Sequence, residues 1–188
     1  MVNHEQGTRY VILELAQDLL RERGYTGFSY GQIADRLDVK PAAIHYYFPG
    51  KESLGVTLVG RERRRFKKMS ARLAKQGVWA RLEWFLNIYE HYSLGGTRVC
   101  YLGALESGYG ELPESLKTQV KSLNNEMLDW LASLLREGRA KKEFAFKGDP
   151  EDKGALILGA LQGAIQIARV SSPRRLHAVM RQIKAELK

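Results

Sequence analysis

Apolar residues recur every three or four positions along nearly the whole chain, which restricts the fold to helices packed on helices. One such stripe, with alternating steps of four and three, consists of Leu116, Val120, Leu123, Met127, Trp130 and Leu134. Residues at this spacing lie on one face of an α-helix. Because no stretch shows the sustained alternation of a half-buried strand, the pattern predicts an all-α fold.

Turn and cap residues divide this pattern into about nine helices. Asp149-Pro150 indicates a helix start, since a capping residue precedes a proline whose missing N–H costs nothing in the first turn. Gly24 and the pair Gly95-Gly96 indicate breaks. The predicted helices span about 8–23, 30–37, 41–47, 51–73, 78–93, 100–108, 114–137, 150–170 and 173–187.

Composition restricts the class of protein. The 188 residues are 44% hydrophobic and 27% charged, as in an ordinary folded chain of one or two domains. The single cysteine excludes an internal disulfide and a cysteine zinc cage, and we expect neither a metal nor a cofactor. Since no transmembrane-length apolar run occurs and the first nine residues are polar, we expect a cytoplasmic protein without a signal peptide.

The positive charge is concentrated near the start of the chain. Residues 1–75 hold 14 Lys+Arg and 8 Asp+Glu, so they contribute +6 of the formal net charge of +9. A localised basic excess indicates a polyanionic partner, with nucleic acid first and an anionic membrane second. On charge alone, a purely solubilising role is an equal alternative.

Two short predicted helices, 30–37 and 41–47, are joined by only three residues. This arrangement is typical of a helix-turn-helix motif, whose second helix enters the major groove of DNA. Asp38 occupies the turn position that needs a positive φ, which aspartate tolerates better than most residues. Helical spacing assigns to the packed face Ile44, Tyr47 and Phe48. The residues left for DNA are Ala42, Ala43, His45 and Tyr46.

Three sequence blocks carry a family resemblance. They read Arg-Gly-Tyr-Thr-Gly-Phe-Ser (23–29), Ile-Ala-Asp-Arg-Leu-Asp-Val (33–39) and His-Tyr-Tyr-Phe-Pro-Gly-Lys-Glu-Ser-Leu (45–54). With them, residues 8–54 resemble the DNA-binding region of TetR-family transcriptional regulators. The resemblance implies DNA contacts by Ser29, Tyr30, Lys40, Pro41, Ala42, Ala43, His45, Tyr46, Tyr47 and Lys51.

The resemblance also implies how the chain is organised. A helix-turn-helix domain over residues 6–66, with its motif at 29–48, would be followed by a helical domain over 67–188 that binds an effector and pairs two subunits. Three residues differ from the usual family pattern. Asp38 replaces the usual glycine of the turn, Lys40 replaces a small hydroxyl residue, and His45 replaces a common tyrosine. These differences affect the prediction of the operator sequence and not the identification of the motif.

The segment 150–170 is expected to pair with a second chain. It is apolar nearly all round and carries Gly154, Gly159 and Gly163, which would let two helix backbones approach closely. We therefore predict a homodimer through a four-helix interface of 150–170 and 173–187; the alternative is a helix buried inside one chain. The predicted interface residues are Leu156, Gly159, Gly163, Leu176, Met180 and Ile183.

Aromatic residues are frequent between residues 79 and 130, where the resemblance implies a ligand cavity. Tyrosine and tryptophan line apolar cavities while offering a hydrogen-bond donor, so a small apolar or aromatic effector is expected. Simple core packing is the alternative. The predicted effector-binding residues are Trp84, Phe85, Tyr89, Tyr92, Cys100, Tyr101, Met127 and Trp130.

Cys100 permits a second interpretation. The segment 100–105 resembles part of a TetR subgroup in which some members sense electrophiles or oxidants, and Arg98 is close in sequence. Its helix-start position would favour the thiolate. A small buried hydrophobic residue is the alternative.

These observations predict a ligand-responsive repressor that binds a palindromic double-stranded operator as a dimer and is released by a small effector. A redox-sensing regulator using Cys100 is one alternative. An all-helical enzyme is the other, but the chain lacks a catalytic motif, since its four histidines are scattered: His4, His45, His91 and His177. We therefore expect no enzyme activity.

Overall fold

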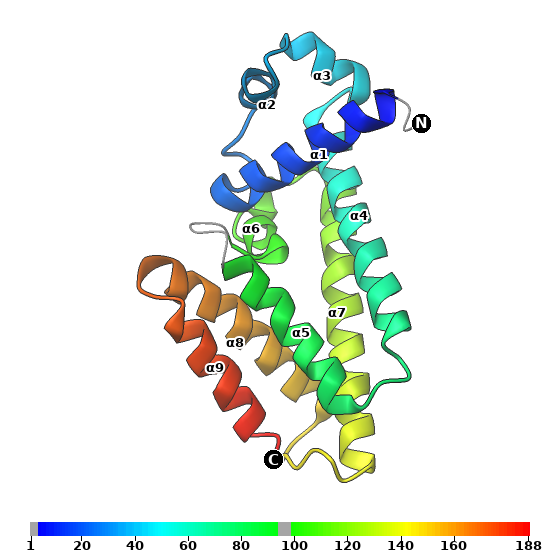
Figure 1. Ribbon diagram of the computed structural model, residues 1–188, viewed down its shortest axis with the longest axis vertical. Helices are drawn as coiled ribbons and strands as arrows, with labels where there is room; N and C mark the ends of the chain where they lie inside the picture. Colours follow the sequence, from blue (N-terminus) through cyan, green and yellow to red (C-terminus); the bar gives the residue numbers. More distant parts are fainter. Residues whose placement is uncertain (1–3, 94–98) are drawn as a thin grey trace. The chain divides into compact units, whose positions relative to one another are not determined.

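The computed structural model describes residues 4–93 and 99–188, and within these residues the backbone forms nine α-helices and one short 3₁₀ helix (Figure 1). The all-α prediction is confirmed. The predicted break at Gly95-Gly96 and the nearby Arg98 lie outside the described residues. The elements are α1 His4–Arg23, α2 Tyr30–Leu37, α3 Pro41–Tyr47, α4 Lys51–Arg72, α5 Val78–Ser93, α6 Tyr101–Glu106, η1 Tyr109–Glu111, α7 Glu114–Ala140, α8 Pro150–Val170 and α9 Arg174–Ala185.

The chain divides into two compact units. The first unit comprises Met1–Arg64 and Tyr101–Lys121, and the second comprises Arg65–Cys100 and Ser122–Lys188. The first unit thus takes α6 and η1 from the middle of the chain. α4 and α7 each contribute residues to both units.

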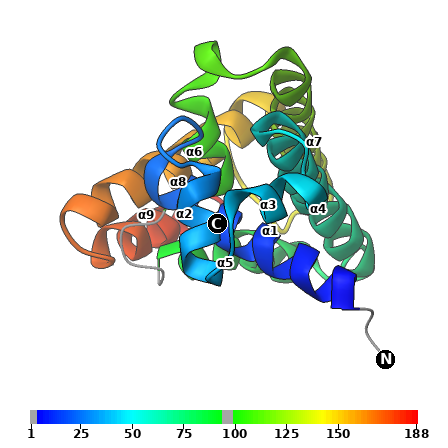
Figure 2. The same ribbon diagram turned by 90° about the horizontal axis from the view of Figure 1, so that it is seen from above.

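The first unit is built around α1. Its inward face, Ile12, Ala16, Leu19 and Leu20, is fully buried, as the helical spacing predicts. α6 packs against α1, and α2 lies beside α3 (Figure 2). α1 ends at Arg23, and Gly24 adopts φ +77°, the left-handed conformation that glycine reaches without steric cost.

The turn between α2 and α3 has the geometry of a helix-turn-helix motif. Asp38 adopts φ 52° and ψ 47°, the left-handed conformation predicted for it. The backbone N–H of Val39 donates to the carbonyl of Ala34 at 3.0 Å, which closes α2 with a Schellman-type bond. α3 then begins at once, with Pro41 in its first turn.

Because Asp38 is left-handed, glycine is expected to be more stable than alanine at this position, the reverse of the order inside a helix. Asp38→Gly is expected to be more stable than Asp38→Ala by about 1 kcal/mol, because glycine has no Cβ to clash at positive φ. At Asp35, inside α2, the order should reverse by a similar amount. Urea denaturation of the four variants measures both differences; the same order at both positions would contradict the role of the turn.

The second unit includes a pair of antiparallel helices, α8 and α9, with α5 packed against α8 (Figure 1). Asp149 caps α8 by accepting the N–H of Glu151 at 2.8 Å, and Pro150 occupies the first turn, as predicted. α9 begins one residue later than expected, at Arg174, because Pro173 serves as its N-cap. In the described part of the chain, no helix combines the length and apolar character needed to span a bilayer.

Candidate functional site

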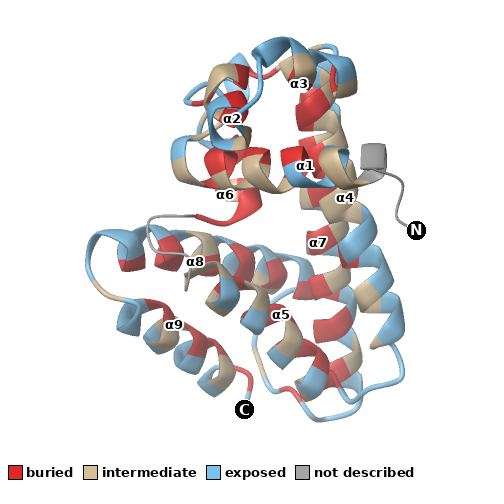
Figure 3. Ribbon diagram, turned by 45° about the horizontal axis from the view of Figure 1, so that its top comes forward, coloured by how far each residue is buried: buried red, intermediate tan, exposed pale blue. Residues whose placement is uncertain are grey.

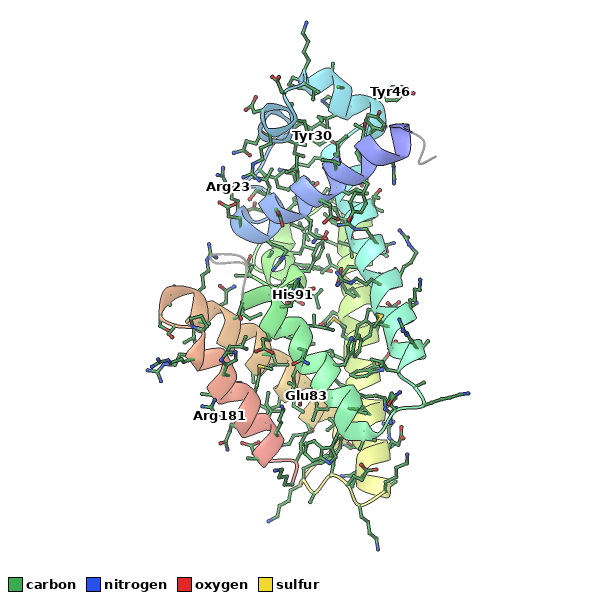
Figure 4. All side chains as sticks on the ribbon, in the orientation of Figure 1. Arg23, Tyr30, Tyr46, Glu83, His91 and Arg181 are labelled. Carbon is green, nitrogen blue, oxygen red and sulfur yellow. The ribbon has the colours of Figure 1, made fainter. Side chains whose placement is uncertain are left out.

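The second helix of the helix-turn-helix motif, α3, presents a polar and small-residue face outward. Ile44 and Phe48 are buried, as predicted, whereas Tyr47 is half-buried. Tyr46 is 71% exposed, and its side chain points away from the unit (Figure 4). The other exposed residues of this outer face are Lys40, Pro41, Ala42 and His45, with Ala43 half-buried beside them. Side chains of this kind reach base edges and thymine methyl groups in a major groove.

Contacts to α2 hold this outer face in position. The hydroxyl of Tyr30 donates to the carbonyl of Phe48 at 3.0 Å and so ties the start of α2 to the end of α3. Burial raises the pKa of Tyr30 to about 12, with a smaller contribution from Tyr25, so the phenol remains a donor. The ring of His45 lies 4.7 Å from that of Tyr30, centroid to centroid.

His45 makes a hydrogen bond that determines which edge of its ring is available. Nδ1 lies 3.2 Å from the carbonyl oxygen of Pro49. A carbonyl oxygen only accepts, so Nδ1 carries a proton in this arrangement. Neutral His45 therefore presents Nε2 as a hydrogen-bond acceptor, whereas the tyrosine more common in the family would present a hydroxyl.

Ser29 forms a complete capping box with Gln32. The N–H of Ser29 donates to Oε1 of Gln32 at 2.9 Å, while Oγ of Ser29 accepts from the N–H of Gln32 at 3.5 Å. Ser29 is therefore the N-cap of α2. The other N–H groups of the first turn of α2 form an electropositive end suited to a phosphate.

Lys51, one of the predicted DNA-binding residues, directs its ammonium group towards other residues of the same unit. Its Nζ donates to the carbonyl of Phe28 at 2.5 Å and lies 4.4 and 4.9 Å from the ring centroids of Phe28 and Tyr25. Burial lowers the pKa of Lys51. The ammonium group therefore connects the start of α4 to the loop before α2.

Two exposed cations of the first unit are not among the predicted DNA-binding residues. Arg9 of α1 stacks its guanidinium 4.9 Å from the ring centroid of Phe48, and Arg36 is exposed on α2. The sequence gives little indication of the role of Arg9, because Arg9 and Phe48 are 39 residues apart and their contact arises only on folding. Both add positive charge to the unit that carries α3.

The predicted dimer residues separate into two groups. Leu156 is 59% exposed, and a Cβ added at Gly159 or Gly163 would meet nothing within 4 Å. Exposed positions recur along α8 (Figure 3). Two further apolar residues of this helix are exposed, Ile167 and Val170. In contrast, Leu176, Met180 and Ile183 are buried, so within this chain they pack α9 into the second unit rather than forming an open surface.

Most of the predicted effector residues form one aromatic cluster in the second unit. The ring of Trp130 contacts the rings of Trp84 and Phe85, with centroids 5.4 Å apart in both pairs. Tyr89 extends the cluster from Phe85, Tyr92 extends it from Tyr89, and Met127 is also buried. Phe66 of α4, which the predicted set omitted, contacts Trp84, Phe85 and Trp130.

Cys100 and Tyr101 are adjacent in the chain but are assigned to different units. Both are buried, with 3% of each residue exposed. Tyr101 belongs to the first unit, whereas the other seven predicted effector residues belong to the second. The burial of Cys100 favours its interpretation as a packed apolar residue over that of a reactive thiol.

An ion pair in the second unit joins the buried Arg81 to the partly exposed Glu137. Nη2 of Arg81 lies 2.6 Å from Oε2 of Glu137, and Nζ of Lys141 lies 2.8 Å from Oε1 of the same carboxylate. Hydrogen bonds from Arg81 and then from Lys141 lower the pKa of Glu137 from 4.5 to about 2. Glu137 is therefore a carboxylate at any physiological pH.

This lowered pKa predicts a pH-dependent contribution to stability. Because the folded pKa lies below the ordinary value, the contribution is complete above about pH 4.5 and is lost as the pH falls towards 2. Glu137→Gln should lower the free energy of unfolding at neutral pH by about 1 kcal/mol, a small value because the side chain is partly exposed. The difference from the unmodified chain should shrink across that acid range. The exposed Glu143→Gln is the control, and a difference independent of pH would contradict the assignment.

Comparison with known proteins identifies the family. Residues 12–55 match the family model described as bacterial regulatory proteins, tetR family, and residues 74–183 match that of the tetracyclin repressor-like C-terminal domain. The HTH-type transcriptional repressor NemR of Escherichia coli is 22% identical over 175 residues, 89% of this chain and 86% of NemR.

Solved structures agree with this match. A TetR-family transcriptional regulator from Agrobacterium tumefaciens has a TM-score of 0.89 at 25% identity, covering 97% of this chain and 99% of that one. Reduced E. coli NemR has a TM-score of 0.78 at 20% identity, covering 96% and 97%. With both family models matched in order over the same fold, this chain belongs to the TetR family of transcriptional regulators.

Proposed function

We propose that this protein is a ligand-responsive repressor that binds a palindromic DNA operator as a homodimer. The outer face of α3 is the observation that carries the proposal. Its exposed residues lie together on one side, and the left-handed turn at Asp38 and the Tyr30–Phe48 hydrogen bond fix its orientation. Acting on chromosomal DNA would place the protein in the cytoplasm.

The ten predicted DNA-binding residues fall into three roles. Ala42 and Ala43 are small enough to sit on thymine methyl groups, while His45 and Tyr46 reach base edges. Residues that contact the phosphate backbone set the position of the protein on the duplex. For this we propose Ser29, Lys40, Pro41, Tyr47 and, in addition, Arg9. Tyr30 and Lys51 would hold the motif through the carbonyls of Phe48 and Phe28.

Two copies would pair through the exposed face of α8. Leu156, Ile167 and Val170 form an exposed apolar stripe, and such surfaces mark interfaces. Gly159 and Gly163 leave room for a second helix to approach. Beside the stripe, a groove of about 160 Å³ between α8 and α9 offers a socket for side chains of the second copy.

An effector bound in the second unit would act by population shift. Two α3 helices can occupy a palindrome only when they are spaced about one turn of DNA apart. An effector that prefers a differently spaced dimer, with α4 and α6 as connecting elements, would reduce operator occupancy. The shift is limited by the effector's preference between the two states.

Selection of bound duplexes from a random pool tests the proposal directly. We expect enrichment of a palindrome with half-sites about one helical turn apart, salt-sensitive binding and no turnover of the DNA. Repeating the selection with candidate ligands identifies those that release the duplex. If no sequence is enriched over the starting pool, the proposed function is wrong.

A further inference from the structure

A groove of about 300 Å³ opens between the end of α4, the first turn of α5 and the last turns of α7, all within the second unit. Small residues, Ser70, Ala74 and Ser133, leave the space open. The wall also contains one aromatic and two charged side chains that could contact a ligand: Trp130, Arg81 and Glu137. None of these residues except Trp130 was predicted to bind an effector.

Arg81 is the unusual member of this wall. Only 7% of the residue is exposed, although arginine is rarely buried without full pairing. Its Nε is buried and has no hydrogen-bond partner in the described part of the chain, while Nη2 faces Glu137. A buried donor without an acceptor is costly, so a ligand whose acceptor reached this side chain would relieve that cost.

The charges around the groove favour an anionic acceptor. Arg81 and Lys141 together carry two positive charges, and the Glu137 carboxylate between them carries one negative charge. Arg81 also lies in the first turn of α5, a turn without an acidic residue at the positive end of the helix dipole. The net charge of Arg81, Lys141 and Glu137 together is therefore +1.

Trp130 gives the groove an apolar surface that favours an aromatic ring in the ligand. Its indole lies in the groove wall and also contacts Phe66 and Phe85 of the aromatic cluster. An apolar ring placed against this side chain would bury surface that is now half-exposed. The dimensions of the groove restrict such a ligand to one or two rings.

We propose that this groove is the effector site and binds a small aromatic monocarboxylate. The ligand carboxylate accepts hydrogen bonds from the guanidinium of Arg81, and its ring packs against Trp130. This inference rests on the proposed function, since it gives the chemical class of the effector of the same repressor. A purely structural role, in which Arg81 only neutralises Glu137 at the end of α7, is the competing explanation.

Isothermal titration of the purified dimer without DNA separates the two explanations. The probes are benzoate and 1-naphthoate, each compared with its neutral amide. We expect at least one acid to bind about tenfold or more tightly than its amide. Arg81→Gln should remove that preference, whereas Lys75→Gln, which removes an exposed positive charge from the same unit, should retain it.

A second variant covers the case in which Arg81→Gln fails to fold. Ser133→Leu fills the groove from an exposed position of α7 and keeps both Arg81 and Glu137, and it should weaken acid binding to a similar extent. If neither acid binds, if acid and amide bind equally, or if a folded Arg81→Gln binds as the unmodified chain does, the inference is overturned. Operator binding by the ligand-free Ser133→Leu dimer is measured in parallel, so failure of this groove is distinguished from failure of the repressor function.

Discussion

Gly163→Arg is expected to abolish dimerisation and to weaken operator binding by about 100-fold or more. The residue lies on the exposed face of α8 between Leu156 and Ile167, where we propose that the second copy packs. An arginine there places a long charged side chain between two closely approaching backbones. A monomer contacts only one half-site, so the gain from binding both halves together is lost.

The folded monomer should tolerate this substitution. A Cβ at Gly163 meets nothing within 4 Å, and the position is exposed. Arginine is also a better helix former than glycine by roughly 0.7–1 kcal/mol. Loss of the dimer would therefore reflect the interface and not unfolding of α8.

Light scattering after gel filtration gives the mass, and electrophoretic mobility shift with the selected operator gives the affinity. Gly110→Arg is the matched control, because Gly110 is also exposed and open to solvent but belongs to the first unit. It should remain dimeric. A dimeric Gly163→Arg protein with full operator affinity would show that α8 does not form the interface.

Local features of the helix-turn-helix motif were predictable because each depends on a few adjacent residues. The Asp38 turn, the cap by Ser29 and Pro41 in the first turn of α3 follow from backbone geometry that neighbouring residues determine. The burial of Ile44 and Phe48 follows from helical spacing in the same way.

Features that depend on distant contacts were not predictable. Spacing identifies the apolar face of α9 but not what covers it, and in this chain Leu176 and Met180 face the rest of the second unit. Lys51 is drawn inward by a carbonyl 23 residues earlier, and Arg81 is buried by a carboxylate 56 residues later. Composition alone gives no indication that a charged side chain is buried.

Tyr46→Ala is expected to lower specific operator affinity by about 10- to 100-fold while leaving the dimer intact. The side chain is largely exposed on the outer face of α3, so its removal costs little stability. A lost base-edge contact typically costs about 1–3 kcal/mol of discrimination. Tyr109→Ala, which removes an exposed tyrosine from η1 of the same unit, should leave affinity unchanged.

Mobility-shift titrations with the selected operator and with a scrambled duplex of equal length resolve what Tyr46 does. Affinity for the scrambled duplex is set by phosphate contacts, so Tyr46→Ala should leave it nearly unchanged. Lys40→Ala, in contrast, should weaken binding to both duplexes and reduce the salt dependence. If Tyr46→Ala lowers the affinity for both duplexes equally, Tyr46 contacts the phosphate backbone and not the bases. If it leaves the affinity for the operator unchanged, Tyr46 does not contact the DNA. The ratio of the two affinities is therefore the quantity that assigns α3 to sequence recognition, because only residues that reach base edges change that ratio.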